Sequence, residues 1–368
     1  MYIFKYFGYY IQLINMALSK NMTIAIAAVV VVIIVAAAAA VVLSDNGGNP
    51  SDEGPSGYED GSVTVTTFTD YNGNTATLTF DSVPDRVVVG CNTALNLLLY
   101  LGLGDNIVGI YYNEEEVWDE VADEYAEVVE RLGEVDASGA RNLSQNISTD
   151  VLLSWEPDLV IGWVSWNDEG LGSVDFFKDN GCNVMSFNSM TDSSYRNLES
   201  MKTDYDNIGK IFNVSDKTTA LYNQIIDTVD SITTDLEGQD TIYYALVDGA
   251  VDVDEGTIWV YSDTNFIASV LNQIGLTNAF PAGGTISLAS VYEAIGTTNI
   301  DLLIFIAYDN VNLEGSVASW LADPDLSQCE AVQNGDYIEM KLSCSYGTSP
   351  ELLDVLEYVE NYVLEMNA

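Results

Sequence analysis

The hydrophobic positions divide the chain into an apolar N-terminal stretch and a long region of alternating strand and helix patterns. Residues 23–43 form an uncharged apolar run that is long enough to cross a hydrocarbon core as a helix. We predict that this run is a transmembrane anchor or a signal, preceded by a cytoplasmic N-terminus at residues 1–22. Residues 44–62 are dense in Gly, Ser, Pro, Asp and Glu, and this composition predicts a flexible linker.

Short buried-strand patterns alternate with helical spacing after the linker. The segment from Val63 to Phe80 alternates threonine and apolar residues about a turn at 71–74, and it therefore predicts a hairpin. Further strand patterns, with helical spacing between them, lie at 86–90, 108–111, 159–163 and 183–187. We predict that residues 63–194 form an N-terminal α/β lobe.

The second half of the chain repeats this organisation. Residues 195–238 show helical spacing only and are predicted to be connecting helices, whereas residues 239–368 return to the strand and helix alternation of a C-terminal α/β lobe. The two lobes share a short repeat, in which an acid precedes Asp158 and Asp301 by eight positions and an apolar strand follows. The predicted fold class is therefore α/β, with two lobes joined by a long helical segment and preceded by one transmembrane helix.

Charge and composition exclude several kinds of function. The chain has 56 acidic and 11 basic residues, a net charge of -45, so nucleic acid is not expected as a partner. It has no histidine, which removes the commonest metal ligand and general base, and we predict neither an enzyme nor a metal site nor a cofactor. Cys329 and Cys344 flank a predicted hairpin, and either a disulfide or two buried free thiols fits them.

Four short segments follow one another along the chain: Val83–Val89, Leu101–Gly109, Glu156–Ile161 and Ala331–Tyr337. In this order they resemble the opening strand, the next turn, the strand entry and the final hairpin of the iron-siderophore and cobalamin class of periplasmic binding proteins. The resemblance runs from about residue 81 to the end of the chain. It departs at Thr298–Asp301, where the usual proline is missing, and the loops that contact ligand show no match that we can assign.

The resemblance implies the extracytoplasmic substrate-binding component of an ABC importer. Such a protein would capture a metal chelate, namely a ferric siderophore, a corrinoid or haem, in the cleft between two lobes. It would deliver this ligand to the permease and ATPase subunits, and the N-terminal helix would hold it at the cell membrane as a single-pass protein. A cell-surface adhesion or envelope protein without small-molecule transport is the main alternative, and a chelatase-like enzyme is a weaker one.

Ligands of open α/β sheets bind outside the carboxyl ends of the strands, and this rule selects the candidate loops. Aromatic rings there could stack on a planar ligand, although core packing is the alternative for each ring. Arg141 could pair with a carboxylate or catecholate. The candidate ligand-binding residues are Asn92, Tyr111, Tyr112, Arg141, Trp163, Trp166, Trp259, Tyr261 and Tyr308. The resemblance also suggests Glu169 and Glu293 as permease-docking acids, with solvated surface acids as the alternative.

Overall fold

The structure, a computed structural model, describes most of the chain after the predicted linker. The described residues are 61–70, 73–111, 117–132, 142–143, 147–163, 172–191, 194, 196–248, 256–307 and 313–366. The predicted membrane segment at residues 23–43 therefore lies outside the described residues. Within those ranges, no helix is both long and apolar enough to span a membrane.

The described part opens with a two-stranded antiparallel hairpin. Strands β1 (Val63–Phe68) and β2 (Thr75–Phe80) pair along their whole length, from Val63 opposite Phe80 to Phe68 opposite Thr75. Because the residues alternate, Leu78 and Phe80 point into the core while their threonine neighbours are exposed. The predicted hairpin is confirmed.

A five-stranded, wholly parallel sheet follows, with the strand order β5-β4-β3-β6-β7. The three residues of β3 and of β6 are all buried, as expected for a parallel sheet with both faces covered. Its strands are β3 (Val87–Val89), β4 (Ile107–Tyr111), β5 (Asn142–Leu143), β6 (Leu159–Ile161) and β7 (Asn183–Met185). Its helices are α3 (Asn92–Tyr100), α4 (Ala122–Leu132), α5 (Thr149–Ser154) and α6 (Val174–Asp179), with short 3-10 turns at Gly104–Asn106, Asp119–Val121 and Asn188–Met190.

A second, six-stranded sheet forms the C-terminal half, with the order β11-β9-β8-β12-β13 and β10 beside β8. β8, β12 and β13 are parallel, whereas β9 and β11 run antiparallel at one edge. The strands are β8 (Tyr243–Asp248), β9 (Thr257–Val260), β10 (Thr277–Asn278), β11 (Gly284–Ser287), β12 (Leu302–Ala307) and β13 (Tyr337–Lys341). The helices are α9 (Phe266–Gln273), α10 (Leu288–Thr297), α11 (Leu313–Ala322), α12 (Glu330–Asn334) and α13 (Leu342–Ser345), with a 3-10 turn at Leu326–Gln328.

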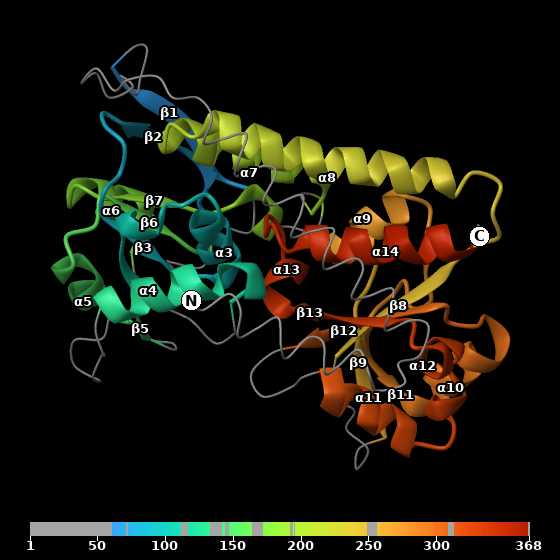
Figure 1. Cartoon of the computed structure of the whole chain (residues 1–368). Coiled ribbons are helices and arrows are strands. Elements are labelled where there is room, and N and C mark those ends of the chain that lie inside the picture. Colours follow the sequence, from blue (N-terminus) through green and yellow to red (C-terminus); the bar gives the residue numbers. More distant parts are fainter. Residues whose placement is uncertain are drawn as a thin grey trace, which may run out of the picture. The chain divides into compact units, whose positions relative to one another are not determined.

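Long helices lie between the two sheets in the sequence. Helix α7 (Leu198–Ile211) leads directly into α8 (Ser215–Asp235), the longest helix of the described residues, and the C-terminal helix α14 (Leu352–Met366) packs against α8 (Figure 1). The buried residues of α8 recur every three or four positions, so one stripe faces the core. This core joins both sheets to the helices, whereas a second core lies on the other face of the C-terminal sheet.

The aspartate that precedes the strand in each repeat, Asp158 or Asp301, has the same structural role in both halves. Asp158, just before β6, accepts hydrogen bonds from the backbone nitrogens of Asp85 and Arg86 at 3.1 and 3.2 Å, just before β3. Asp301, just before β12, accepts one from the backbone nitrogen of Tyr243 at 2.7 Å, at the start of β8. In each sheet the carboxylate therefore binds the amino-terminal end of the neighbouring parallel strand.

One predicted element is wrong. The segment Ala331–Tyr337 is no hairpin, because α12 ends at Gly335 and β13 then pairs in parallel with β12. Cys329 and Cys344 are buried free thiols, and they belong to the two different cores of the C-terminal half. These two cores lie on opposite faces of the same sheet, so the sheet lies between the two cysteines. The structure therefore supports two buried free thiols rather than a disulfide.

A buried carboxylate connects the end of the N-terminal sheet to the segment before α14. Asp204 of α7 is completely buried, and its oxygens accept hydrogen bonds from both nitrogens of Asn188, the nitrogen and hydroxyl of Ser189, and the hydroxyl of Thr348 at 2.6–3.1 Å. Burial raises the pKa of Asp204, although these donors lower it in part. Asp204 thus ties together three segments that are distant in the sequence.

A second buried carboxylate holds the same segment from the other side. Glu351 accepts the backbone nitrogen of Lys341 at 2.7 Å and the hydroxyl of Ser343 at 3.3 Å. Ser343 in turn contacts α3, since its carbonyl accepts from the Thr93 hydroxyl at 2.6 Å and its hydroxyl from the Asn96 amide at 3.3 Å. These bonds fix the position of α13 between the two sheets.

The Asp204 network predicts a strong and local effect of mutation. Asp204→Asn places an amide group against donors that need an acceptor, and we expect it to lower the free energy of unfolding by about 3 kcal/mol, as measured by urea denaturation. Asp206→Asn is the matched control, because Asp206 lies on the same helix in a solvent-accessible pair with Lys202, and we expect a loss below about 1 kcal/mol. Equal losses in the two variants would contradict the proposed role of the network.

The Glu351 site predicts a pH dependence of stability. Burial is the main cause that raises the pKa of Glu351 from 4.5 to about 8. The folded chain then keeps a proton that the unfolded chain releases, so the stability of the wild-type protein should fall as pH rises between these two values. Glu351→Gln should make this dependence shallower, with the largest gain over wild type above pH 8. Unfolding free energies are measured across this range, with Glu365→Gln in α14 as the control. A wild-type slope in Glu351→Gln would contradict this role of Glu351.

Candidate functional site

The described residues form a pocket of about 460 Å³ at the carboxyl ends of β8 and β13. Asp248 is the last residue of β8, and Leu342 follows the last residue of β13. This volume is within the usual range for small-molecule sites, and the position agrees with the strand-end rule used to choose the candidate loops. The lining residues are Arg196, Asp248, Trp259, Val260, Tyr261, Ser262, Thr264, Asn265, Gly284, Leu342 and Tyr346.

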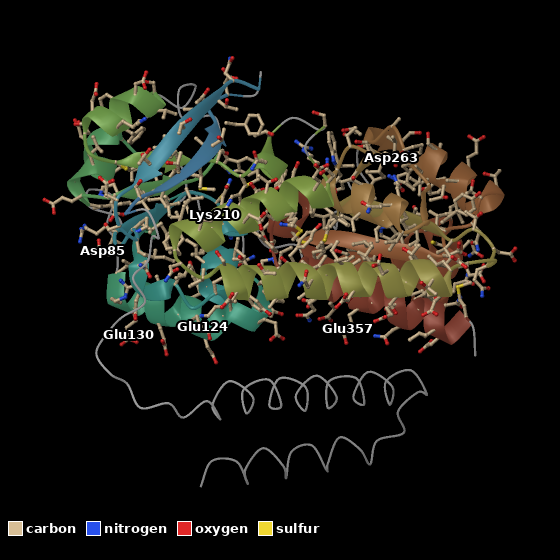
Figure 2. The ribbon with its side chains drawn as sticks, turned by 90° about the horizontal axis from the view of Figure 1, so that it is seen from above. Asp85, Glu124, Glu130, Lys210, Asp263 and Glu357 are labelled. Atoms are coloured by element: carbon tan, nitrogen blue, oxygen red, sulfur yellow. The ribbon has the colours of Figure 1, made fainter. Side chains whose placement is uncertain are left out.

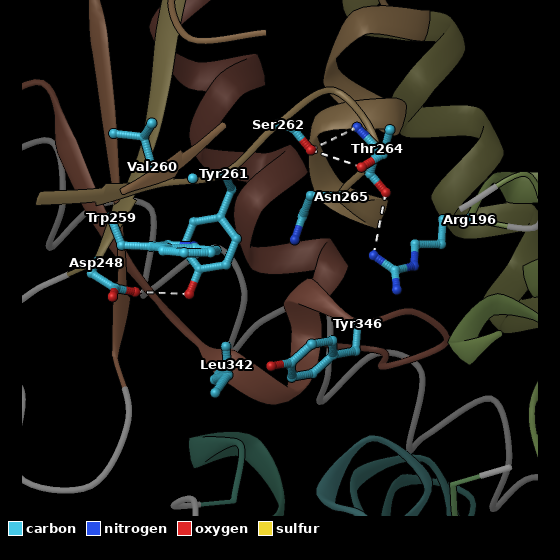
Figure 3. A pocket seen from close by; sticks show the side chains of 11 residues that line it. Arg196, Asp248, Trp259, Val260, Tyr261, Ser262, Thr264, Asn265, Leu342 and Tyr346 are labelled. Carbon is cyan, nitrogen blue, oxygen red and sulfur yellow. Dashed lines mark hydrogen bonds between the residues drawn. The ribbon is translucent and has the colours of Figure 1, made fainter. Parts of the chain in front are cut away.

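Aromatic side chains of β9 and the loop after it form one wall of the pocket (Figure 3). Trp259 is 45% exposed, a large value for this side chain, and its ring meets that of Tyr261 edge-on with centroids 6.5 Å apart. The hydroxyl of Tyr261 donates to Asp248 Oδ1 at 2.8 Å. Both predicted aromatic residues therefore line the pocket, and the hydrogen bond orients the tyrosine ring.

Arg196, just before α7, lies on the other side of the pocket (Figure 3). Its Nη1 donates to the carbonyl of Thr264 at 3.4 Å, which is a long hydrogen bond. Its Nε is buried and has no hydrogen-bond partner among the described residues. The guanidinium group therefore retains donors for an anionic or carbonyl oxygen.

Trp163 reaches the pocket only through a second ring. It follows β6 at the carboxyl edge of the N-terminal sheet, and it packs edge-on against Tyr346 with centroids 5.0 Å apart. Tyr346 itself lines the pocket. Trp163 thus supports a pocket residue, while the lining of the pocket does not include it.

Asn92 and Tyr111 are buried at the same edge of the N-terminal sheet, with 5% and 4% of their surface exposed. The ring of Tyr111 occupies the space beside Gly90, where a Cβ atom would lie less than 3 Å from it. Neither residue lines the pocket. The structure places both within the packed interior, and a contact of either with ligand stays a prediction.

Of the remaining candidate residues from the sequence, the structure describes only Glu293. Glu293 is exposed on α10, away from the pocket lining. Tyr112, Arg141, Trp166, Glu169 and Tyr308 lie outside the described residues.

Sequence reasoning missed six of the polar and aromatic lining residues: Arg196, Asp248, Ser262, Thr264, Asn265 and Tyr346. The strand-end rule selected the loop that begins at Asp248, but no signal identified the carboxylate itself. Arg196 and Tyr346 lie at the ends of helical segments, and their approach to this loop depends on the tertiary contacts around Asp204 and Glu351.

Solved structures of several binding proteins share the fold. A periplasmic binding protein from Veillonella parvula is 22% identical, with a TM-score of 0.63, and covers 82% of this chain and 97% of its own. The petrobactin-binding protein of Bacillus subtilis is 19% identical, with a TM-score of 0.60, and covers 82% and 98%. The periplasmic catecholate-siderophore binding protein of Vibrio cholerae is 17% identical, with a TM-score of 0.59, and covers 82% and 100%. No curated protein sequence matches the chain significantly.

The sequence comparison identifies the family. The family described as periplasmic binding protein matches residues 87–342, which is well over half of the chain and includes most of the pocket lining. This match confirms the resemblance that the sequence motifs indicated, and it makes the chain a binding protein rather than an enzyme. The protein belongs to the periplasmic binding protein family.

Proposed function

We propose that this protein is the extracytoplasmic ligand-capture component of an ABC importer, and that it binds a metal chelate in the aromatic pocket. The observation that carries the proposal is the pocket itself, which opens at the strand ends of a periplasmic binding protein and is lined by Trp259, Tyr261 and Tyr346. A ferric siderophore is the first candidate ligand, with corrinoids and haem as the other metal chelates to test.

The chemistry of the lining supports a ligand with a flat or apolar part. Trp259 is an exposed aromatic residue of the lining, and stacking on an aromatic ring contributes about 0.5 to 1.5 kcal/mol per ring pair beyond the burial of area. Arg196 adds hydrogen-bond donors for the oxygen atoms of a chelating group. Two of the similar structures are named for petrobactin and catecholate siderophores, and this supports a ferric chelate here.

Delivery requires that the protein is held near a permease. In the proposal, residues 23–43 anchor the chain in the membrane as a single-pass helix or direct its export, and the binding domain lies outside the cytoplasm. Glu169 and Glu293 are the proposed contacts with basic residues of the permease, whose ATPase subunits drive import. The exposure of Glu293 on α10 is compatible with this role.

The first test is thermal unfolding of the full-length chain in detergent micelles with ferric siderophores, cobalamin, cobinamide and haem. A ligand at about 100 times its Kd should stabilise the folded state by about 2.7 kcal/mol and raise the Tm. A rise with one class of chelate supports capture as the function. The same Tm with every chelate would refute the proposal and favour the adhesion or envelope alternative.

The proposal also predicts which exposed aromatic residue matters. Trp259→Ala should weaken binding of the chelate found above by about tenfold, because the stacked ring is lost. Phe176→Ala is the matched control, since Phe176 is 39% exposed on α6 and does not line the pocket. Fluorescence titration gives both dissociation constants, and similar values for the two variants would place the ligand elsewhere.

A further inference from the structure

The segment that enters helix α9 gives the pocket a polar side. Ser262, Thr264 and Asn265 all line the pocket, and Asn265 is the N-cap residue of α9. The first backbone N–H groups of a helix have no partner within the helix, so its amino-terminal end favours hydrogen-bond acceptors. A ligand in the pocket therefore meets the amino-terminal end of α9 on this side.

The side chain of Asn265 is held in one orientation by the fold. Its Oδ1 accepts from the backbone nitrogen of Ile267 at 2.9 Å, which is the capping hydrogen bond of α9. Only the oxygen of the amide can accept this bond, so the nitrogen must lie on the other side of the group. Figure 3 shows this nitrogen directed into the pocket.

The Nδ2 group of Asn265 is a donor that the described part of the chain does not use. Asn265 is only 6% exposed, and its Nδ2 has no hydrogen-bond partner among the described residues. A ligand that excludes water from a buried donor without supplying an acceptor leaves that donor unsatisfied, which weakens binding. The donor therefore discriminates between ligands by what they place against it.

The loop that carries this donor is rigid. Gly283 has φ +63°, and a Cβ atom there would lie less than 3 Å from the backbone nitrogen of Ser262. The backbone nitrogen of Asp263 donates to the carbonyl of Pro281 at 3.1 Å, and the hydroxyls of Ser262 and Thr264 hydrogen-bond at 2.7 Å. A donor on such a loop loses little conformational entropy when a ligand binds.

A second donor reaches the same loop from the segment before α7. Nη1 of Arg196 donates to the carbonyl of Thr264, the residue before Asn265, and Arg196 also lines the pocket. A guanidinium group has no acceptor, and the acceptor of the Asn265 amide is already used by the helix. Both side chains therefore present only donors to a ligand.

Hydrogen bonding rather than net charge distinguishes this side of the pocket. Asp263 belongs to the same loop, but it is exposed on the outside of the described part and is absent from the described lining (Figure 2). Its carboxylate opposes the positive charge of Arg196, so the loop does not select an anion by charge alone. The donors select an acceptor oxygen, which a hydroxamate, a catecholate, a carboxylate or an amide can supply.

We propose that Asn265 is a specificity-determining residue of the pocket, and that its Nδ2 donates to an acceptor oxygen of the bound chelate at the amino-terminal end of α9. Arg196 donates to the ligand beside it, and the flat or apolar part of the ligand lies against Trp259. This inference rests on the proposed function, because it takes the ligand to be a metal chelate. It excludes a ligand that places an ammonium group or an apolar surface against Asn265.

Two substitutions separate the pocket donor from the helix cap. Asparagine, serine and aspartate are comparable N-cap residues, so Asn265→Ser and Asn265→Asp both keep an acceptor for the backbone nitrogen of Ile267. Asn265→Ser removes the donor without adding charge, whereas Asn265→Asp replaces the donor by an acceptor in a group of the same shape. We expect both full-length variants to keep the wild-type Tm in the absence of ligand.

Fluorescence titration of the full-length chain in detergent micelles measures the effect on binding. The probes are ferrioxamine B, ferric citrate, ferric enterobactin, cobalamin and haem. For every chelate that the wild-type protein binds, we expect Asn265→Ser to weaken binding about tenfold and Asn265→Asp about a hundredfold. The chelate that binds shows whether the oxygen belongs to a hydroxamate, a carboxylate, a catecholate or a corrinoid amide.

Matched controls and outcomes distinguish the inference from the proposed function. Asn223→Ser and Asn223→Asp make the same changes at an exposed residue of α8 outside the described lining, and they should keep the wild-type affinities. Wild-type affinity in Asn265→Ser, or equal losses in the Asn223 variants, would overturn the inference and leave the proposed function intact. Failure of every chelate to bind the wild-type protein would overturn both.

Discussion

The burial of the Asp204 carboxylate is the constraint on which the arrangement of the described residues depends. A carboxylate removed from water costs several kcal/mol unless hydrogen-bond donors surround it. The donors of Asp204 come from Asn188 and Ser189 after β7 and from Thr348 before α14, so these distant segments must meet at α7. A misplaced segment would leave a buried charge without donors, and this penalty selects one arrangement.

The same constraint determines the lining of the pocket. Thr348 and Glu351 fix the two ends of the segment that contains α13, and this segment carries Leu342 and Tyr346 into the pocket. Gly347 allows the close approach, because a Cβ atom at this position would overlap the side chain of Ser189. The pocket is therefore built partly by residues whose position depends on polar contacts in the interior rather than on the strands that they follow.

The elements that could be predicted are those whose own residues show a distinctive hydrophobic pattern. β3, β6, β8 and β12 were predicted because buried parallel strands read as continuous apolar runs. α4 was missed because it is rich in charge and buries only Val128 and Leu132. The segment Ala331–Tyr337 was interpreted as a hairpin because it resembles the final hairpin of the family. Gly335, with φ +84°, instead ends α12.

The candidate site was predictable only as far as the strand-end rule reaches. Trp259 and Tyr261 were predicted because they are aromatic residues near a strand end, and both line the pocket. Tyr111 was predicted for the same reason, but its ring packs against Gly90. The sequence alone does not separate these two environments. Arg196 was beyond prediction for a different reason. In this acid-rich chain, Arg86 and Lys217 bind carbonyls just after the ends of α5 and α3, where cations offset the partial negative charge of a helix terminus.

Arg196 has no comparable task in the fold, since it precedes α7 rather than following a helix and its bond to Thr264 is long. A partly buried cation with an unpartnered Nε lowers the stability of the folded chain unless another group satisfies it. Residues at binding sites are the usual exceptions to the rule that buried polar groups are paired within the protein. Most of the basic residues in the described part of the chain have a carbonyl or carboxylate partner within the fold, whereas Arg196, which lines the pocket, makes one long hydrogen bond to the Thr264 carbonyl.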